Sequence, residues 1–382
     1  MDFLQEARDV SQWIIDQRRW LHRHPEHGYQ EFKTSAHIVQ VLTELGMEPQ
    51  RMAETGVVAD LVGGKPGPIV AFRADMDALP ITENTGLPFA SEHPGMMHAC
   101  GHDLHMAAAL GMAKLLAAHR EELPGTVRFL FQPDEEATGG ALRMVREGCL
   151  EGVSQVYGAH VRPDLPAGQV AVCAGDYYAA NNTFNITLRG VTAHGAEPQN
   201  GADAIVAGAQ VVTALQSLVS RRKAPLKPSV VTVGSFHAGT QRNILAGEAV
   251  LQGIIRSFGE ENRRFLSDSL RSLVTGIAAG MGVEAQIEII PNHPGIINHK
   301  ASADLVRQAA QKVVGPERVV EDHPVMVSED FGYFIQKLPG CFYHLGVGGP
   351  ATLHSDRFCP EEWPLADAAA VHAQVIWDAL CE

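Results

Sequence analysis

The sequence predicts an α/β protein in which a larger domain with a mostly parallel sheet is interrupted by a smaller, ferredoxin-like α+β domain. Three observations favour this fold class. The chain has 382 residues, more than the roughly 250–300 at which a single hydrophobic core stops growing. Short apolar runs alternate with helical periodicity near both ends of the chain. Between these ends, residues 176–293 show the order β-α-β-β-α-β, which defines the inserted domain.

Composition narrows the partners and the cellular location. With 45% hydrophobic and 19% charged residues, the chain can fill packed cores, which excludes a disordered, collagen-like or coiled-coil protein. Its net charge of −14 would repel nucleic-acid phosphates and an anionic membrane surface. No run approaches the roughly 20 apolar residues that span a bilayer, and the N-terminus lacks the layout of a signal peptide. The six cysteines are scattered, as expected for reduced thiols. We therefore expect a cytoplasmic protein without a nucleic-acid or membrane partner.

The first part of the larger domain, residues 1–175, shows four apolar runs and two prominent helical stretches. Thr34 and Ser35 can cap the first helix, and Gly46 can stop it. An Ala/Leu/Met-rich stretch predicts the second helix at 104–118. The runs predict strands at 57–61, 69–72, 127–131 and 170–172. Polar clusters follow the strands at 69–72 and 127–131, and ligands of open α/β sheets bind outside the carboxyl ends of strands.

The insert and the last part of the chain continue this order. Within 176–293, alternation at 184–188 is followed by a helix at 202–219, strands at 229–236 and 249–255, a helix at 261–279 and a strand at 285–290. From 294 to 382 the α/β pattern resumes with a helix at 301–314, a strand at 342–347 and a helix at 366–380. The simplest topology places 176–293 as one domain inserted into another, formed by 1–175 and 294–382.

The segment HACGHDLH, at 98–105, is the densest group of chemically active side chains. Thiolate and imidazole suit Zn²⁺, and the spacing of Cys100 and His102 lets two donors converge from one turn. The alternative is a buried structural cysteine beside solvated histidines. Three histidines and an aspartate within eight residues favour a metal site.

A second group, QPDEE at 132–136, carries a predicted strand into adjacent carboxylates. Because successive side chains of extended backbone point opposite ways, Glu136 can bind a cation while Glu135 faces the water that the cation activates. Metal-assisted hydrolysis requires this division. The alternative is a solvated acidic turn. The position at the end of an apolar strand disfavours it.

Two histidines follow other predicted strands, at 160 and 354. An isolated histidine in such a place is more often structural than a ligand. Combined with the two groups above, however, they complete five donors, the number that two cations sharing a bridging ligand would need. The predicted donors are Cys100, His102, Glu136, His160 and His354.

Taken together, these motifs resemble the dinuclear-metal aminoacylase and carboxypeptidase superfamily, in its amidohydrolase branch of hippurate hydrolases, N-acyl-L-amino acid amidohydrolases and indole-acetyl-amino acid hydrolases. The resemblance covers nearly the whole chain. Its landmarks are LHRHPE (21–26), FRADMDALP (72–80), MHACGHD (97–103), QPDEE (132–136), GVTAH (190–194), RNI (242–244), SEDF (328–331) and LH (353–354).

The resemblance implies two divalent metal ions per subunit, with Cys100 as the bridging thiolate and Glu135 as the general acid and base. It assigns the other four donors to the two coordination spheres. Softness of the thiolate favours Zn²⁺, while the nitrogen and oxygen donors would also accept Mn²⁺, Co²⁺ or Ni²⁺. Asp75 and Asp77 either orient the ligands from behind or cap the loop after their strand.

The resemblance also implies roles for the insert, as a lid and as a dimerisation domain. His194 would stabilise an oxyanion, reaching into the partner subunit of a homodimer. Asn243 and Arg256 offer an amide and a cationic fork to a substrate carboxylate.

The expected activity is metal-dependent hydrolysis of N-acyl-L-amino acids to a carboxylic acid and a free amino acid. A dipeptidase or carboxypeptidase of the same superfamily is the nearest alternative. A non-catalytic metal-binding protein, or a ligand-binding module that uses only the insert, are the others. Neither the acyl group nor the amino acid follows from the sequence.

Overall fold

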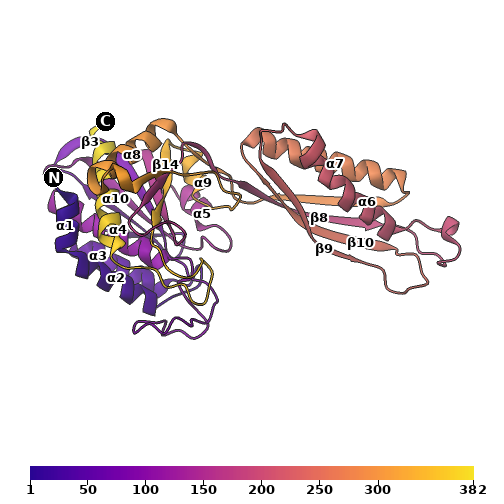
Figure 1. Ribbon diagram of the computed structural model, residues 1–382, viewed down its shortest axis with the longest axis horizontal. Coiled ribbons are helices and arrows are strands. Elements are labelled where there is room, and N and C mark those ends of the chain that lie inside the picture. The colour runs from indigo at the N-terminus through magenta and orange to yellow at the C-terminus, as the bar shows by residue number, and fades with distance from the viewer. The chain divides into compact units, whose positions relative to one another are not determined.

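The computed structural model describes residues 1–382 and contains two compact units. Unit 1 comprises Met1–Gly175, Ile297–His323 and Asp330–Glu382, and unit 2 comprises Asp176–Ile296 and Pro324–Glu329 (Figure 1). The chain passes between the units at β7 (Gly175–Tyr178) and β12 (Ile296–Asn298), and again on either side of residues 324–329. The mixed α/β class with a large, mostly parallel sheet is confirmed. Residues 324–329 group with unit 2, where Val325 N–H donates to Tyr177 O at 2.8 Å.

Unit 1 is built on an eight-stranded sheet in the order β1-β2-β4-β3-β5-β14-β6-β13. The inner pairs β4-β3, β3-β5 and β5-β14 are parallel, as is β6-β13, whereas β1-β2, β2-β4 and β14-β6 are antiparallel. The strands are β1 (Gln50–Met52), β2 (Gly56–Val62), β3 (Lys65–Asp75), β4 (Pro124–Gln132), β5 (Val153–Arg162), β6 (Val170–Val172), β13 (Val319–Glu321) and β14 (Gly340–Gly346). The parallel strands β3 and β4 both end at acidic segments, so these segments lie side by side at the carboxyl ends of the two strands.

The helices of unit 1 bury most of its apolar residues against the sheet. The central helix α4 is apolar nearly all round and almost fully buried, as expected for a core helix rather than a surface one. It packs beside the C-terminal helix α10. The helices are α1 (Phe3–Asp9), α2 (Ser11–Arg23), α3 (Phe32–Glu44), α4 (His102–Ala118), α5 (Gly140–Arg146), α8 (Lys300–Val314), α9 (Gly332–Ile335) and α10 (Pro364–Cys381).

The start of α3 corrects one prediction. Thr34 and Ser35 lie inside the helix, so their assignment as its caps is wrong. Instead, the carboxylate of Glu26 accepts hydrogen bonds from the backbone N–H groups of Lys33 (3.0 Å) and Thr34 (2.9 Å). A carboxylate from outside the helix thus satisfies donors that an N-cap side chain usually takes. Gly46, with φ of 80°, follows the end of the helix as predicted.

Unit 2 is a four-stranded antiparallel sheet in the order β11-β8-β10-β9, packed against two helices. Its elements follow the chain as β8 (Ala180–Arg189), α6 (Ala204–Ser217), β9 (Ser229–Ala238), β10 (Glu248–Ser257), α7 (Glu260–Gly280) and β11 (Glu284–Pro291). The core includes Phe184, Ile186 and Leu188, which alternate along β8.

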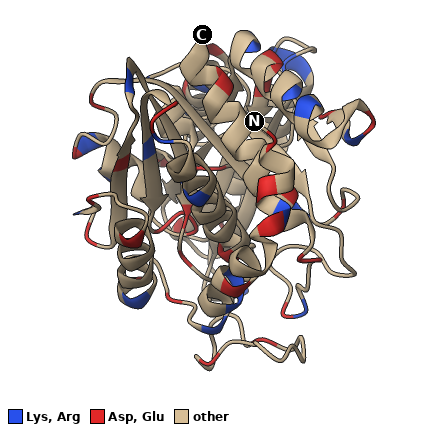
Figure 2. Cartoon of the chain, turned by 90° about the vertical axis from the view of Figure 1, so that its left-hand side faces the viewer, with Lys and Arg blue, Asp and Glu red and all other residues tan.

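One helical stretch, Ala204–Arg222, is long and apolar enough to cross a membrane by length and composition alone. Ala207, Val211 and Leu215 of this stretch are buried in the core of unit 2. Core helices of soluble proteins can be equally long and apolar, so length and composition are weak evidence for a membrane span here. In Figure 2, acidic and basic residues are interspersed over helices and loops.

Candidate active site

Two groups of donors meet at the sulfur of Cys100. One group is Cys100, His102 and His160, and the other is Cys100, Glu136 and His354; within each, one potential ligand atom per residue lies within 4.8 Å of the others. The Sγ atom is 3.4 Å from His160 Nε2 and 3.3 Å from His354 Nε2. Each distance is shorter than the sum of a zinc–sulfur bond (about 2.3 Å) and a zinc–nitrogen bond (about 2.0 Å). An ion can therefore contact the sulfur together with either nitrogen. The structure therefore brings all five predicted donors together.

Backbone carbonyls orient the two buried histidines. The Nδ1 atom of His102 lies 2.8 Å from Asp77 O, and that of His160 lies 2.8 Å from Val161 O. Each carbonyl can only accept, so each Nδ1 carries a proton, which leaves Nε2 as the nitrogen of each ring that can bind a cation. His102 Nε2 is buried and has no hydrogen-bond partner. An unpaired buried polar nitrogen is costly, and a cation bound at this point would give it a partner.

The donors on the other side are more accessible. The side chain of His354 is 54% exposed, and its Nε2 lies 3.2 Å from Glu136 Oε1. His354 is in the loop after β14 with a left-handed φ of 61°. Its backbone N–H donates to Ala99 O at 2.8 Å. This bond brings a residue near the C-terminus beside Cys100.

Gly101 allows Cys100 and His102 to face the same point. It is the N-cap of α4 and has φ of 89°, a conformation that favours glycine. A Cβ atom here would lie 2.5 Å from the side chain of Val161. Both the turn and the close approach to β5 therefore require a residue without a side chain.

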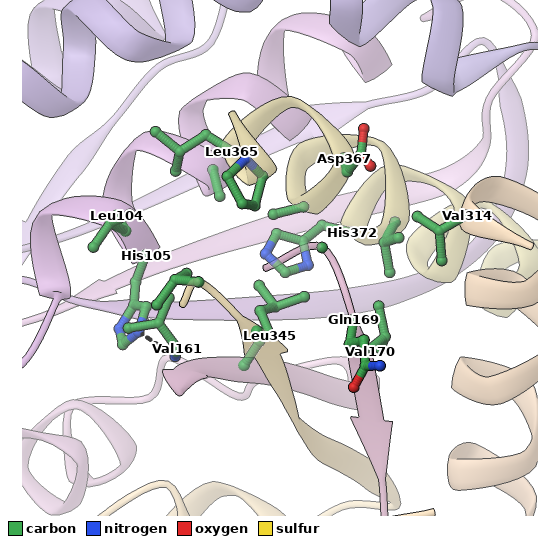
Figure 3. A pocket seen from close by; sticks show the side chains of 18 of the residues that line it. Leu104, His105, Val161, Gln169, Val170, Val314, Leu345, Leu365, Asp367 and His372 are labelled. Atoms are coloured by element: carbon green, nitrogen blue, oxygen red, sulfur yellow. Dashed lines mark hydrogen bonds between the residues drawn. The ribbon is translucent and has the colours of Figure 1, made fainter. Parts of the chain in front are cut away.

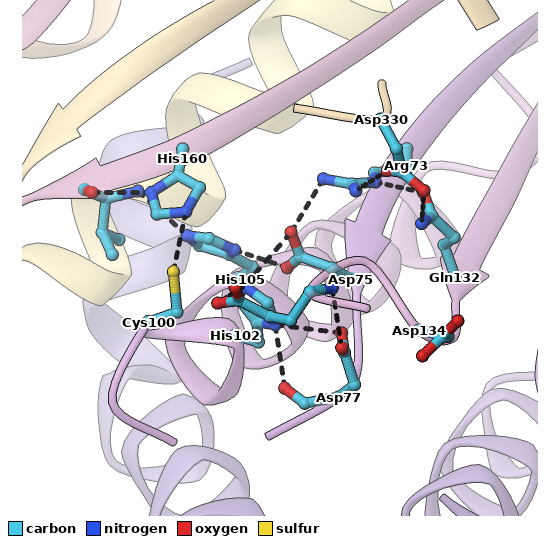
Figure 4. A network of polar contacts seen from close by, with 12 residues as sticks. Arg73, Asp75, Asp77, Cys100, His102, His105, Gln132, Asp134, His160 and Asp330 are labelled. Atoms are coloured by element: carbon cyan, nitrogen blue, oxygen red, sulfur yellow. Dashed lines mark hydrogen bonds and ion pairs between the residues drawn. The ribbon is translucent and has the colours of Figure 1, made fainter. Parts of the chain in front are cut away.

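Behind the donors, a buried polar network fixes their positions (Figure 4). Asp75 Oδ1 lies 2.6 Å from His105 Nδ1, and Asp75 Oδ2 accepts from Arg73 Nη1 at 2.8 Å. His105 Nε2 accepts from the N–H of Val161, at 2.9 Å. Because Val161 follows His160 directly, His105 connects Asp75 to the strand that carries a donor.

Asp77 connects the two polar strand ends. Its Oδ2 accepts from the backbone N–H of Glu136 at 3.0 Å, and its carbonyl accepts from His102. The neighbouring Glu135 is half-buried, and a carboxylate oxygen of it lies within 4.8 Å of ligand atoms of both Glu136 and His102. The acidic turn therefore places one carboxylate beside Cys100 and a second one next to it.

The electrostatics of the cluster fit a cation. Burial, reinforced by Glu136 and Glu135, raises the pKa of the Cys100 thiol well above its ordinary value. Burial opposes protonation of His102, but Asp75 and Asp77 outweigh it and raise its pKa to about 10. Burial lowers the pKa of His160 well below its ordinary value. A divalent ion takes thiolate and neutral imidazole as ligands, so its binding would displace the protons that Cys100 and His102 otherwise keep, whereas His160 is already neutral.

The three residues predicted in the insert are not brought together. His194 and Asn243 lie in adjacent loops of unit 2, where Gly195 N–H donates to Asn243 O at 2.8 Å, and both are exposed. Arg256 is near the end of β10, opposite Asn181 of β8, and its Nη1 is buried without a hydrogen-bond partner. Burial lowers the pKa of this guanidinium. The loops with His194 and Asn243 therefore lie at one end of the sheet and Arg256 lies near the other end.

Several buried polar residues near the site were not assigned from the sequence. His105 was one; its spacing of three residues from His102 on one helix, which puts both on the same face, could have found it. Next to His102, Asp103 lies 2.8 Å from both Arg18 Nε and His22 Nδ1. These partners are more than 80 residues away in the chain, so no local pattern indicates them.

A cavity lies on the other side of His105, between the sheet and helices α4 and α10 (Figure 3). Its walls are mainly apolar, and His372, one of several polar side chains that line it, has a pKa that burial lowers to about 3. None of the five donors lines this cavity. The chemistry is therefore to be sought at the Cys100 cluster.

The fold and this cluster define a class: mixed α/β proteins whose donor cluster, near the carboxyl ends of parallel strands, is suited to hold metal ions. The model of the peptidase family M20/M25/M40 matches residues 71–378. The chain belongs to this family. This membership confirms the predicted resemblance and the prediction that the protein is a hydrolase acting on amide bonds.

Known proteins resemble the chain over nearly its full length. The chain is 39% identical to an N-acetyl-L-cysteine deacetylase of Bacillus subtilis, over 93% of this chain and 85% of that protein. It is 36% identical to thermostable carboxypeptidase 1 of Saccharolobus solfataricus, over 96% and 95%. A solved structure of a dinuclear metal binding peptidase of the M20 family from Bacillus subtilis is 35% identical, covers 98% of this chain and 99% of that chain, and superposes with a TM-score of 0.88.

Proposed function

We propose that this protein hydrolyses the amide bond of N-acyl-L-amino acids, using two divalent metal ions. The observation that carries the proposal is the convergence of two donor groups on one cysteine sulfur, with a second carboxylate beside them. A storage site needs ligands but no adjacent base, so Glu135 favours catalysis. The names of the deacetylase relatives support an N-acyl amino acid as the substrate class.

Cys100 would bridge the two ions, with His102 and His160 on one side and Glu136 and His354 on the other. We propose Zn²⁺, on the softness of the thiolate, with Mn²⁺, Co²⁺ or Ni²⁺ as alternatives. Bound divalent cations supply Lewis acidity, which polarises the scissile carbonyl and lowers the pKa of a water molecule. Asp75 and Asp77 hold the imidazoles and the acidic turn in place, as outer partners of metal ligands do.

Glu135 would be the general acid and base. Its carboxylate takes the proton of the attacking water and then delivers it to the departing amine nitrogen. The hydrogen bond from Glu136 N to Asp77 fixes the turn that aims Glu135. Arg256 would bind the carboxylate of the amino acid, since its Nη1 is buried without a partner and a guanidinium fork matches a carboxylate.

His194 and Asn243 would act on the site of a partner subunit in a homodimer. Eight residues of β10 separate Glu248, opposite Arg189, from Arg256, opposite Asn181, and at about 3.4 Å per residue this is roughly 27 Å. Gly190 and Gly247, hydrogen-bonded at 2.9 Å, place His194 and Asn243 beyond the far end of that span. A small substrate cannot reach both ends of one unit 2. A second copy can supply the missing end, which makes unit 2 both a lid and a dimerisation domain.

The edge strand β9 supports the same arrangement. It is ten residues long and forms one edge of its sheet, with Val230 and Phe236 exposed. Exposed Ile205 and Val206 lie on the neighbouring helix α6. Long apolar edge strands tend to pair with another chain.

We also propose that the protein is located in the cytoplasm.

A carboxypeptidase is the second candidate, because a relative similar over nearly the whole chain carries that name. Metal-stripped protein is assayed on N-acetyl, N-benzoyl and N-indole-acetyl amino acids and on dipeptides, after each divalent cation is restored separately. We expect the N-acyl amino acids to be cleaved faster than the dipeptides. Preference for peptides would favour the carboxypeptidase, and no turnover with any cation would contradict both.

A further inference from the structure

The acidic turn with Glu135 and Glu136 is held from outside the site by Glu31. This residue is the N-cap of α3 and is 0% exposed. Its Oε1 accepts a hydrogen bond from the backbone N–H of Asp134 at 3.0 Å, and its Oε2 accepts from the hydroxyl of Thr55 at 2.6 Å. One carboxyl group therefore joins three segments that are distant in the chain.

The backbone around this carboxyl is strained. Five residues other than glycine have positive φ angles, a region that most side chains avoid. Four of the five lie in the segments that Glu31 joins: Tyr29, Ala53, Glu54 and Asp134. Such conformations persist only where surrounding groups hold them, and they cluster at functional sites. Asp134, with φ of 52°, is the one that directly precedes Glu135.

Asp134 is fixed on both sides. Its carbonyl accepts from the N–H groups of Gly139 (3.1 Å) and Gly140 (2.9 Å), which closes the turn on itself. On its N-terminal side, Glu31 supplies the acceptor. The segment before Glu31 also packs directly on Asp134, since a Cβ on Gly28 would lie 1.9 Å from Asp134 Oδ1. Rotation of the backbone at Asp134 would change the direction of both glutamates that follow it.

We propose that Glu31 is a positioning residue for the proposed hydrolysis: it holds Asp134 in the left-handed conformation that aims Glu135 and Glu136. The inference rests on the proposed function. The hydrogen bond from Asp134 N–H requires an acceptor oxygen on the side chain of residue 31 and not a negative charge, because a backbone N–H is the donor. In agreement, burial raises the pKa of Glu31 to about 7, so that both protonation states occur near neutral pH. A carboxamide of the same length can replace the carboxyl.

Three substitutions test whether position 31 needs an acceptor oxygen of this length or a negative charge. Glu31→Gln keeps length and an acceptor, Glu31→Asp keeps the charge but withdraws the carboxyl by one methylene, and Glu31→Ala removes it. Loss of an outer partner in a metal site typically costs about 10- to 100-fold in activity or metal affinity. We expect a fall of that size in kcat for Glu31→Ala and Glu31→Asp with little change in KM, and near wild-type kcat for Glu31→Gln. Equal activity of the Asp and Gln variants, or a loss confined to KM, would overturn the proposal.

Hydrogen exchange separates positioning from general stability. Thr55→Val is the matched control: it is equally buried and removes one hydrogen bond to Glu31 but leaves Asp134 N–H paired. In metal-free protein, we expect faster exchange of the amides of residues 134–140 in Glu31→Asp than in wild type, and no such local change in Thr55→Val. The same change in both variants would mean that Glu31 acts only through stability, which contradicts the proposal. Exchange reports the tether without turnover, so an inactive wild-type protein would count against the proposed function alone.

Discussion

The predicted site residues of unit 1 and those of unit 2 differ in how they are held. Cys100, His102 and His160 are buried, and backbone carbonyls fix the imidazole rings. His194 and Asn243 are exposed on loops, at the other end of their sheet from Arg256. A rigid core can assemble a metal site within one chain, because packing and hydrogen bonds leave each donor a single direction. Exposed polar residues acquire a role only when another body is placed against them.

The largest expected effect concerns Glu135, which distinguishes a catalytic cluster from a storage site. Glu135→Gln removes the proposed base, and general acid–base catalysis contributes about 10²- to 10⁴-fold. We expect kcat to fall by that factor while elemental analysis finds the metal content of the wild type. High residual turnover would remove Glu135 from this role.

A second test addresses the exposed residues of unit 2. His194→Ala should lower kcat by about 10²- to 10³-fold, as loss of an oxyanion donor does, with a smaller rise in KM. A rise in KM alone would instead assign His194 to substrate binding.

Mixed dimers sharpen the comparison between the units. If the proposed homodimer forms, co-production of the Glu135→Gln chain and the His194→Ala chain with different tags yields heterodimers. If His194 acts across the interface, one site of each heterodimer combines an intact Glu135 with an intact His194 of the partner subunit. We expect purified heterodimers to regain about half of the wild-type activity, since oligomers of this kind are symmetric. No recovery would place both residues in the site of one chain.

The third effect concerns Cys100, the proposed bridging thiolate. Replacement of a metal ligand should weaken binding by more than the roughly 10- to 100-fold that outer partners contribute, so Cys100→Ser should bind less metal after dialysis. Cys149→Ser is the control, because Cys149 is also buried but belongs to none of the donor groups. Equal stoichiometry in both variants would contradict a bridging role.

The smallest effect is a pH dependence of stability. The pKa of Glu31 is raised from 4.5 to about 7 by burial. The unfolded chain therefore releases this proton at lower pH than the folded chain. The associated stability is present below pH 4.5 and is lost as pH rises through about 7, at most about 3 kcal/mol.

Glu31→Gln should remove this loss. We expect the free energy of unfolding of the wild type to fall relative to Glu31→Gln between pH 5 and pH 8, as measured by denaturant titration in one metal state. Glu48→Gln, at an exposed position, should follow the wild type. Parallel curves for wild type and Glu31→Gln would show that Glu31 does not titrate in this range.

The sequence predicted the parts of the fold that local pattern controls. The apolar run at 127–131 lies within β4, that at 170–172 coincides with β6, and the helix at 104–118 lies within α4. The cap of α3 was wrong because Glu26 supplies it from outside the helix. Periodicity cannot indicate such a donor.

For the candidate site, the donors were visible in the sequence but their supports were not. Cys100 and His102 stand out by residue type and spacing. Glu31 and Asp134 are 103 residues apart, and nothing in either segment indicates the hydrogen bond between them. The left-handed φ of His354 and its bond to Ala99 also depend on tertiary packing. Long-range polar contacts of this kind are specified by the folded core.

Anomalous diffraction from crystals of zinc-loaded protein tests the central claim most directly. The account predicts two peaks, each about 2.3 Å from Cys100 Sγ, one beside His102 and His160 and the other beside Glu136 and His354. A single peak, or peaks distant from Cys100, would contradict a dinuclear centre bridged by this thiolate.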